Sequence, residues 1–112
     1  MKSLDLRSVT YVGYDVVSSI VTENSAVYRA ANISFVQMPE NLDLLVSGDL
    51  VIVKDVLIHL DNAASLNILS VLSKKFKFVL TINNYTENTI EYNKEINIGD
   101  FRPVDVSIAP FI

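Results

Sequence analysis

Apolar and polar positions change their spacing along the chain in a regular way. Short β-branched and aromatic runs such as VTYVGYDV and ISFVQ are typical of strands, whereas other segments place apolar side chains at helical intervals. The pattern predicts, in order, a strand over 9–16, a helix over 18–31, strands over 33–37 and 49–55, a helix over 60–75 and a strand over 76–83.

The two predicted helices have recognisable ends. Ser18 or Ser19 can cap the first helix, and Asp61 or Asn62 can cap the second. The basic run KKFK at 74–77 fits the C-terminal end of the second helix, where positive side chains interact favourably with the helix dipole. The apolar stripe of the second predicted helix consists of Leu66, Ile68, Leu69, Val71 and Leu72.

The order strand, helix, strand, strand, helix, strand predicts an α/β fold. We expect a Rossmann-like, mostly parallel sheet with helices on both faces. The continuous apolar run DLVIVKD at 49–55 is typical of a strand buried on both faces. In such sheets ligands bind at the carboxyl ends of the strands. Asp15 and Asp55, each at the end of a predicted strand, are therefore the first candidate site residues.

The remaining segments are polar or rich in turn residues. We expect a loop or helical turn over 39–48, closed by Gly48, and a mobile loop over 84–95. The tail over 96–112 has room for one short strand.

Composition narrows the class of protein. A chain of 112 residues, half of them apolar, is long enough for one domain at most. It contains no cysteine, so disulfides and thiolate chemistry are excluded, and no apolar run is long enough to span a membrane. The opening residues show no apolar signal segment, from which we expect a cytoplasmic protein. The net charge of −4 makes a nucleic-acid partner unlikely.

Asp15 has two interpretations. An acid at a strand end of a Rossmann-like unit accepts hydrogen bonds from ribose hydroxyls, normally some 20 residues after a glycine-rich turn. The chain holds three glycines, Gly13, Gly48 and Gly99, and no two of them are close together. The other interpretation is that Asp15 caps the following helix.

Four segments together resemble one protein family. YVGYDVV, DLVIVKDVLIHL, FKFVLTIN and GDFRPVDVSIAPF resemble, in order, segments of a poorly characterised bacterial group of class I S-adenosylmethionine-dependent methyltransferases. The resemblance implies S-adenosylmethionine as cofactor, bound through Asp15 and Val16. It also implies that Asp55 lies beside the site of methyl transfer.

The chain departs from this family in several places. The family's first strand and glycine-rich loop have no counterpart here, and Pro39 stands about where an acid near the adenine is usual. Lys54 replaces the more common arginine, and Phe101 replaces tryptophan. The resemblance therefore implies an incomplete methyltransferase fold, and we expect the isolated chain to bind the cofactor weakly and to be inactive by itself.

His59 and Arg102 complete the candidate residues. His59, with Asp55, could serve in catalysis as a general base; as a metal ligand it has too few partners, and we predict no metal site. Its simpler role is local hydrogen bonding after the strand. Arg102 could hold a substrate carboxylate or phosphate, or it could pair with an acid of its own fold, such as Asp55 or Asp100.

Three functions remain open at this stage. The first is a methyltransferase or a fragment of one, with an unknown methyl acceptor. The second is a non-catalytic interaction or structural module that keeps the fold, and the third is another Rossmann-like nucleotide-binding domain. The absent first strand would leave unpaired apolar edges, so the strands would either close into one four-stranded sheet or associate with a second copy, and we expect a homodimer.

Overall fold

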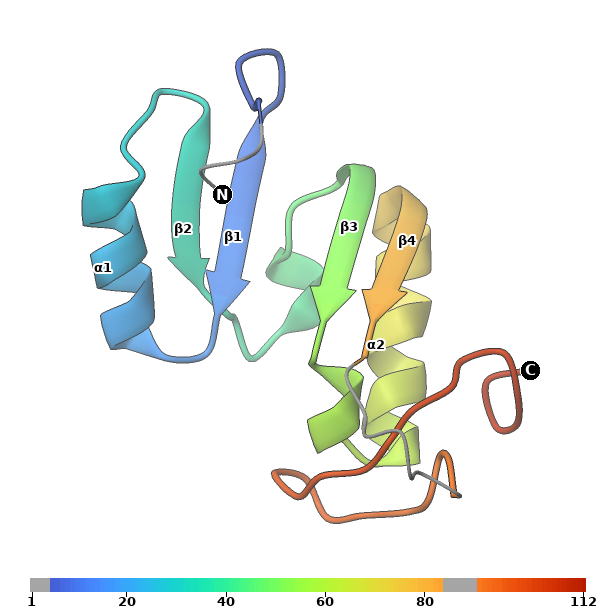
Figure 1. Cartoon of the computed structure of the whole chain (residues 1–112). Coiled ribbons are helices and arrows are strands. Elements are labelled where there is room, and N and C mark those ends of the chain that lie inside the picture. Colours follow the sequence, from blue (N-terminus) through green and yellow to red (C-terminus); the bar gives the residue numbers. More distant parts are fainter. Residues whose placement is uncertain (1–4, 84–90) are drawn as a thin grey trace. The chain divides into compact units, whose positions relative to one another are not determined.

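The computed structural model describes residues 5–83 and 91–112. The chain divides into two compact units, Met1–Asn41 and Leu42–Ile112. Within the described residues, each unit contains two parallel strands joined through a helix (Figure 1). The protein is thus a small α/β protein with parallel strands and helices, as the order of elements in the sequence predicts.

The first unit contains β1 (Tyr11–Asp15), α1 (Ser18–Val27) and β2 (Ile33–Gln37). The two strands pair in parallel, with Gly13 opposite Phe35. A Cβ atom at Gly13 would lie 2.7 Å from the Phe35 ring, so glycine lets that ring pack close to β1. The ring also contacts Tyr11 and Tyr28, at centroid distances of 5.9 and 6.1 Å. These aromatic contacts fasten the end of α1 to the sheet.

Helix α1 differs from its prediction at both ends. Neither predicted serine caps it; Val17 occupies the N-cap position without a side-chain capping bond. The helix ends at Val27 instead of continuing to residue 31, and the Tyr28 N–H donates to Asn24 O at 2.9 Å. The chain then reverses, because Ala30 already bridges to Ile33 at the start of β2. Residues 28–31, which favour a helix locally, therefore form the connection back to the sheet.

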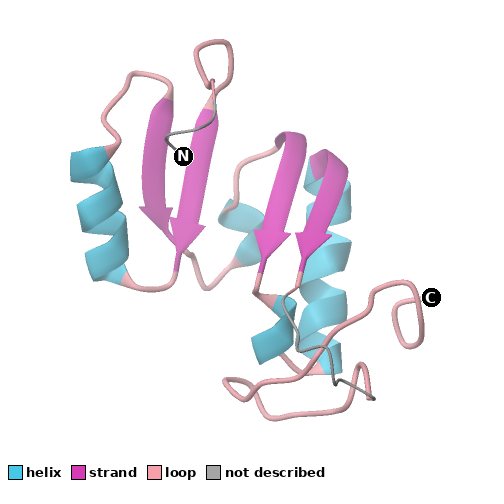
Figure 2. Cartoon of the chain, in the orientation of Figure 1, coloured by secondary structure: helices cyan, strands magenta, loops and turns pink. Residues whose placement is uncertain are grey.

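The second unit contains two strands, one long helix and two short 3-10 turns. Its elements are η1 (Leu42–Leu44), β3 (Gly48–Lys54), η2 (Leu57–His59), α2 (Asn62–Lys75) and β4 (Phe76–Ile82). Strands β3 and β4 pair in parallel, with Leu50 opposite Phe78 and Ile52 opposite Leu80. Helix α2 runs into β4 without an intervening loop (Figure 2).

The caps of α2 follow the sequence prediction. Asp61 is the N-cap, and its carboxylate accepts from the Ala64 N–H at 2.7 Å. Lys74 and Lys75 lie in the last turn, as the basic run predicts. Lys75 also donates to the carbonyl oxygens of Asp43 and Leu45, at 2.8 and 3.0 Å. Lys75 therefore holds the segment around η1 against the end of α2. Its positive charge also interacts favourably with the helix dipole.

The apolar core of the described residues lies in the second unit. Its buried side chains are Leu45, Val53, Leu57, Ile58, Ile68, Leu72 and Val104. Of the predicted helical stripe, Ile68 and Leu72 are buried, whereas Leu66 is 41% exposed. The stripe is therefore narrower than predicted, because α2 covers a sheet of only two strands.

Two further predictions about the strands are wrong. β3 is not buried on both faces: Val53 is 5% exposed, whereas its neighbour Ile52 is 55% exposed. The described strands also form two separate two-stranded sheets, β1 with β2 and β3 with β4, instead of one sheet. A closed four-stranded sheet would need hydrogen bonds between the two pairs.

The remaining expectations concern the C-terminal part. Residues 84–90 of the loop predicted over 84–95 lie outside the described residues. Residues 91–112 contain no strand, so the short strand allowed in the tail is not formed. None of the described helices is long and apolar enough to cross a membrane.

Candidate functional site

The candidate site in the second unit is built around the carboxyl end of β3. Asp55 follows the last residue of the strand and has a left-handed backbone, with φ of 54°. Its N–H donates to Ile82 O at 2.7 Å, which extends the pairing with β4 by one bond. Asp tolerates this conformation better than most residues do. The chain can therefore turn sharply out of the sheet and enter η2.

The carboxylate of Asp55 is held by its neighbour. Lys54 Nζ lies 2.8 Å from Asp55 Oδ2, and the Asp55 side chain is 25% exposed. Asp55 is thus engaged in an ion pair within its own fold. The pair neutralises charge at the strand end, and the partly exposed geometry makes its contribution to stability small.

His59 lies at the end of η2 with its side chain exposed. Its Nδ1 is 2.9 Å from Asp100 O. Because a carbonyl oxygen can only accept, Nδ1 carries the proton in this bond, and in a neutral ring Nε2 is then the basic nitrogen. The ring also meets Phe101 edge-on, with a centroid distance of 6.2 Å. The local hydrogen bonding predicted for His59 is thus present.

The segment GDFR at 99–102 docks on η2 through its backbone. Gly99 N donates to His59 O at 2.8 Å, and Arg102 N donates to Ile58 O at 2.9 Å. Gly99 has a φ of 99°, a conformation that side chains rarely allow. The segments around His59 and Arg102 are therefore neighbours in space although about 40 residues separate them in the sequence.

Arg102 is buried, with only 1% of its surface exposed. Its guanidinium donates to Asn62 Oδ1, to Ser65 Oγ at 3.0 Å and to Lys94 O at 3.1 Å. Burial lowers the pKa of Arg102, and the nearby charges of Glu95 and Asp61 oppose that shift. The side chain thus joins the start of α2 to the C-terminal segment.

The partners of Arg102 differ from those that the sequence suggested. Among the described contacts of its side chain, Asn62 and Ser65 replace Asp55 and Asp100. Neutral partners orient a guanidinium without cancelling its charge. Arg102 Nε is buried and has no hydrogen-bond partner among residues 5–83 and 91–112. The guanidinium is therefore enclosed by its own fold and is not presented to solvent.

Asn93 is a second buried polar residue of this region, which the sequence did not single out. Its side chain donates to Asp105 O and Ala109 O, both at 2.8 Å, and accepts from Asp105 N at 2.9 Å. Asn62 Nδ2 donates to Asn93 O at 3.2 Å. Asn93 has a φ of 59°, which asparagine tolerates. In the sequence, the only feature that points to Asn93 is its position in a long polar loop.

The two candidate cofactor residues lie in the first unit. Asp15 ends β1 as predicted, and its Oδ1 accepts from Val17 N at 2.8 Å, just before α1. Its backbone carbonyl accepts from Met38 N at 2.8 Å. The carboxylate thus holds the turn before α1, but it does not cap the helix as the second interpretation predicts, because Val17 is the N-cap and has no side-chain capping bond. Val16 is 72% exposed.

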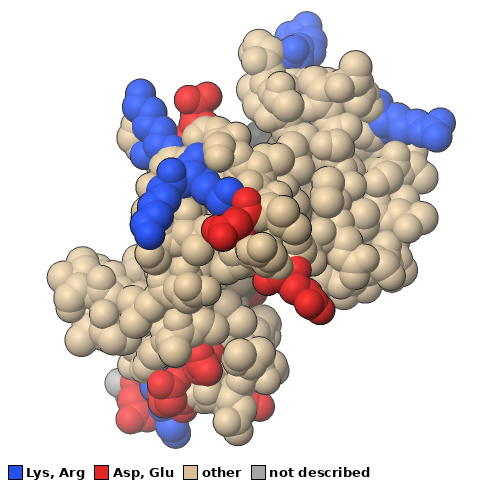
Figure 3. Space-filling view, turned by 180° about the vertical axis from the view of Figure 1, so that it is seen from behind, with Lys and Arg blue, Asp and Glu red and all other residues tan. Residues whose placement is uncertain are grey.

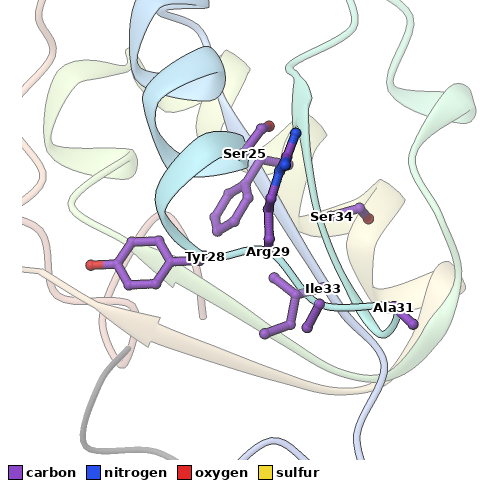
Figure 4. Close-up of a pocket in the computed structure, with 8 residues that line it drawn as sticks. Ser25, Tyr28, Arg29, Ala31, Ile33 and Ser34 are labelled. Carbon is purple, nitrogen blue, oxygen red and sulfur yellow. The ribbon is translucent and has the colours of Figure 1, made fainter.

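A surface hollow of about 510 Å³ lies in the first unit, beside the end of α1 (Figure 4). Tyr28, Arg29 and Ser34 are among its lining residues, and Asp15 is not. In the second unit, a hollow of about 520 Å³ is lined by residues 94–97 with Asp100 and Phe101. Neither hollow is lined by a predicted catalytic or cofactor-binding residue.

Charge and metal-binding groups do not define another site. On the face seen in Figure 3, basic and acidic side chains are interspersed and uncharged residues cover most of the surface. Within the part of the chain that the structure describes, no three His, Asp or Glu residues are grouped as metal ligands.

Comparison of the chain with protein-family models, with curated proteins and with solved structures gives no match. The functional interpretation therefore depends on the residues and contacts described above.

Proposed function

We propose that this chain is an incomplete, Rossmann-like methyltransferase fold related to the class I S-adenosylmethionine-dependent enzymes. The observation that supports this proposal is the docking of GDFR on the residues that follow β3. Segments that resemble the same family, and that lie far apart in the sequence, meet at the carboxyl end of a parallel strand. That edge is where open α/β sheets bind their ligands.

The described residues fit only part of the cofactor. Asp15 offers a carboxylate at a strand end, where ribose hydroxyls would donate to it. One of its oxygens already accepts from Val17 N. The 112 residues contain no glycine-rich turn that would let a backbone approach the methionine portion. The residues therefore do not fit the whole cofactor, and the chain by itself supports no methyl-transfer step.

The proposal predicts that the isolated chain binds S-adenosylmethionine or S-adenosylhomocysteine weakly or undetectably by calorimetry. Nuclear magnetic resonance at high ligand concentration should still detect contact with the ribose, as shifts in the amide signals of residues 15–17. Asp15→Ala should abolish those shifts because it removes the acceptor. Asp49→Ala, which removes an exposed strand carboxylate in the other unit, is the matched control and should leave them in place.

The possible outcomes separate the proposals. Low-micromolar affinity would show that the site is more complete than we propose. Adenosine should reproduce the shifts if ribose is the part that is recognised. An absence of shifts at every ligand concentration would remove the cofactor from the interpretation.

A second candidate function is a non-catalytic interaction module. It is favoured by the way the candidate groups are already used: the Asp55 carboxylate by Lys54, His59 Nδ1 by Asp100 O, and the Arg102 guanidinium by Asn62 and Ser65. Side chains engaged in this way hold the fold together and leave fewer groups for a substrate. Ligand titrations without any shift would support this candidate over the first.

A further inference from the structure

Residues 95–101 of the second unit form a loop whose two ends are fixed close together. Asn93 N donates to Pro103 O at 3.0 Å, and Arg102 Nη1 donates to Lys94 O at 3.1 Å. We call these four residues the neck; its polar side chains Asn93 and Arg102 are 8 and 1% exposed. A short loop with such a closed base is a compact unit of its own. The neck therefore anchors the loop whatever the rest of the loop contacts.

The loop itself is poorly buried. Ile96 is its one partly buried residue, and Ile98 and Phe101 are 66 and 55% exposed. A hollow of about 520 Å³ lies among residues 94–97, Asp100 and Phe101, so these side chains do not pack into a core. Segments with few buried apolar contacts and exposed hydrogen bonds are the ones that open locally.

Among the described residues, three hydrogen bonds join the loop to η2 and α2. Asn62 N, at the start of α2, donates to Glu95 Oε1 at 2.9 Å. Gly99 N donates to His59 O at 2.8 Å, and His59 Nδ1 donates to Asp100 O at 2.9 Å. In Figure 1 the loop is part of the orange trace near the start of α2, beyond the ends of β3 and β4. It therefore lies at the end of the unit to which the carboxyl ends of the strands point.

We propose that residues 95–101 form a lid that opens as one unit about the neck and is held shut by the Glu95 carboxylate. Within the lid, Asp100 N donates to Asn97 O at 3.0 Å, which lets the loop keep its shape as it moves. Opening frees the first N–H of α2 together with the ring and carbonyl of His59. These groups lie at the end of the sheet where α/β proteins bind ligands. The inference does not depend on the proposed methyltransferase relationship.

Electrostatics explains why Glu95 holds the lid. The N–H groups of the first turn of a helix have no partner within the helix, and the helix dipole favours a carboxylate there. Burial lowers the pKa of Arg102, and the charge of Glu95 opposes that shift, so the neck also attracts this carboxylate. Both groups of the bond to Asn62 can exchange their partner for water, because Glu95 is exposed. The contact is therefore favourable but easily reversed.

Gly99 makes the closed lid sensitive to a second substitution. Its φ of 99° is a conformation that other residues rarely adopt. A Cβ atom at this position would meet nothing within 4 Å. Gly99→Ala therefore strains the closed lid without causing a clash, and opening relieves the strain.

Amide hydrogen exchange of the full chain, followed by nuclear magnetic resonance, tests the proposal from both ends of the lid. Glu95→Ala should accelerate exchange of the Gly99 N–H roughly fivefold, although Gly99 is bonded to His59 and not to Glu95. Gly99→Ala should accelerate exchange of the Asn62 N–H roughly tenfold. Asn97→Ala, which removes an exposed amide of the lid, is the matched control and should change neither rate.

The neck and the helix supply internal references. Exchange of the Asn93, Arg102 and Ala64 N–H groups should stay unchanged in both variants, because their bonds to Pro103, Ile58 and the Asp61 cap lie outside the lid. Circular dichroism of every variant confirms that the chain is folded. Glu95→Gln, which keeps an acceptor oxygen and loses the charge, should have a smaller effect than Glu95→Ala.

Two results would overturn the proposal. A Gly99 N–H whose exchange is indifferent to Glu95→Ala would show that the contacts of the loop break independently. Equal acceleration at Gly99, Asn93 and Arg102 would show that the whole C-terminal segment detaches, with no lid moving about a fixed neck.

Discussion

At the scale of single residues, burial decides what a charged side chain can do. Arg102 follows an aromatic residue and precedes a proline, a setting that would suit a substrate clamp. The fold instead encloses it and turns its guanidinium toward Asn62 and Ser65. His59, a few residues after the same strand, remains exposed and is fixed through one ring nitrogen. Arg102 therefore has a structural role, whereas His59 presents its ring to solvent.

We predict that Arg102→Met lowers the free energy of unfolding by about 3 kcal/mol. Methionine fills a similar volume, but it leaves the oxygens of Asn62, Ser65 and Lys94 without their donor. Urea unfolding followed by circular dichroism measures the loss. Lys94→Met is the control, because only the backbone carbonyl of Lys94 takes part, and it should change stability by less than about 0.5 kcal/mol. Equal losses in the two variants would contradict this role of Arg102.

At the scale of elements, the two helices differ in how firmly their sequences define them. α2 has a side-chain cap, basic residues in its last turn and buried residues on one side. α1 has none of these features and no buried residue. The Asp15 carboxylate holds the turn before α1, and Tyr28, just after its last residue, contacts Phe35 of β2. Helix α2 is therefore set mainly by local sequence, whereas α1 relies on its sheet.

We predict that Asp61→Ala lowers the free energy of unfolding by about 1 kcal/mol, since the Ala64 N–H loses its acceptor at the N-terminus of α2. Thermal or urea unfolding measures the change. Asn67→Ala, at an exposed position in the middle of the same helix, should be neutral or slightly stabilising because alanine is the better helix former. An equal effect of the two substitutions would show that the cap is unimportant.

At the scale of the whole molecule, two small α/β units share 112 residues. Short chains bury a limited fraction of their unfolded surface on folding. An apolar face that stays uncovered therefore lowers their stability by a relatively large amount. Exposed apolar side chains of β3 and β4, such as Leu50, Ile52 and Phe78, add to this cost as long as water covers them. Association of two copies would remove that water, which links the stability of the chain to its concentration.

We therefore predict that the melting temperature rises with protein concentration, because only the folded chain can form the homodimer expected from the sequence. Scanning calorimetry over a wide range of protein concentrations measures the shift. Ile52→Glu, which places a charge among these exposed side chains of the sheet, should abolish the dependence on concentration. Leu44→Glu, at an exposed position of η1, should preserve it. A melting temperature that is independent of concentration in the unchanged chain would contradict the prediction.

The sequence by itself determined the order and type of the elements. It defined β2 at residues 33–37, located α2 to within two residues and narrowed its cap to Asp61 or Asn62, because periodicity and capping are local properties. It also pointed to the segments around His59 and Arg102. It could not give the partners of Arg102 or the role of Asn93, because these depend on side chains that are distant in sequence.

Only the tertiary structure decided how the strands pair and which apolar residues remain exposed. The run at 49–55 is apolar on both faces in the sequence, and its pattern cannot tell whether anything covers the second face. Strand pairing is likewise a property of neighbours in space, so four predicted strands were compatible with one sheet or with two. The physical reason is the same in both cases: local patterns encode which groups favour burial, whereas the folded chain determines which of them are buried.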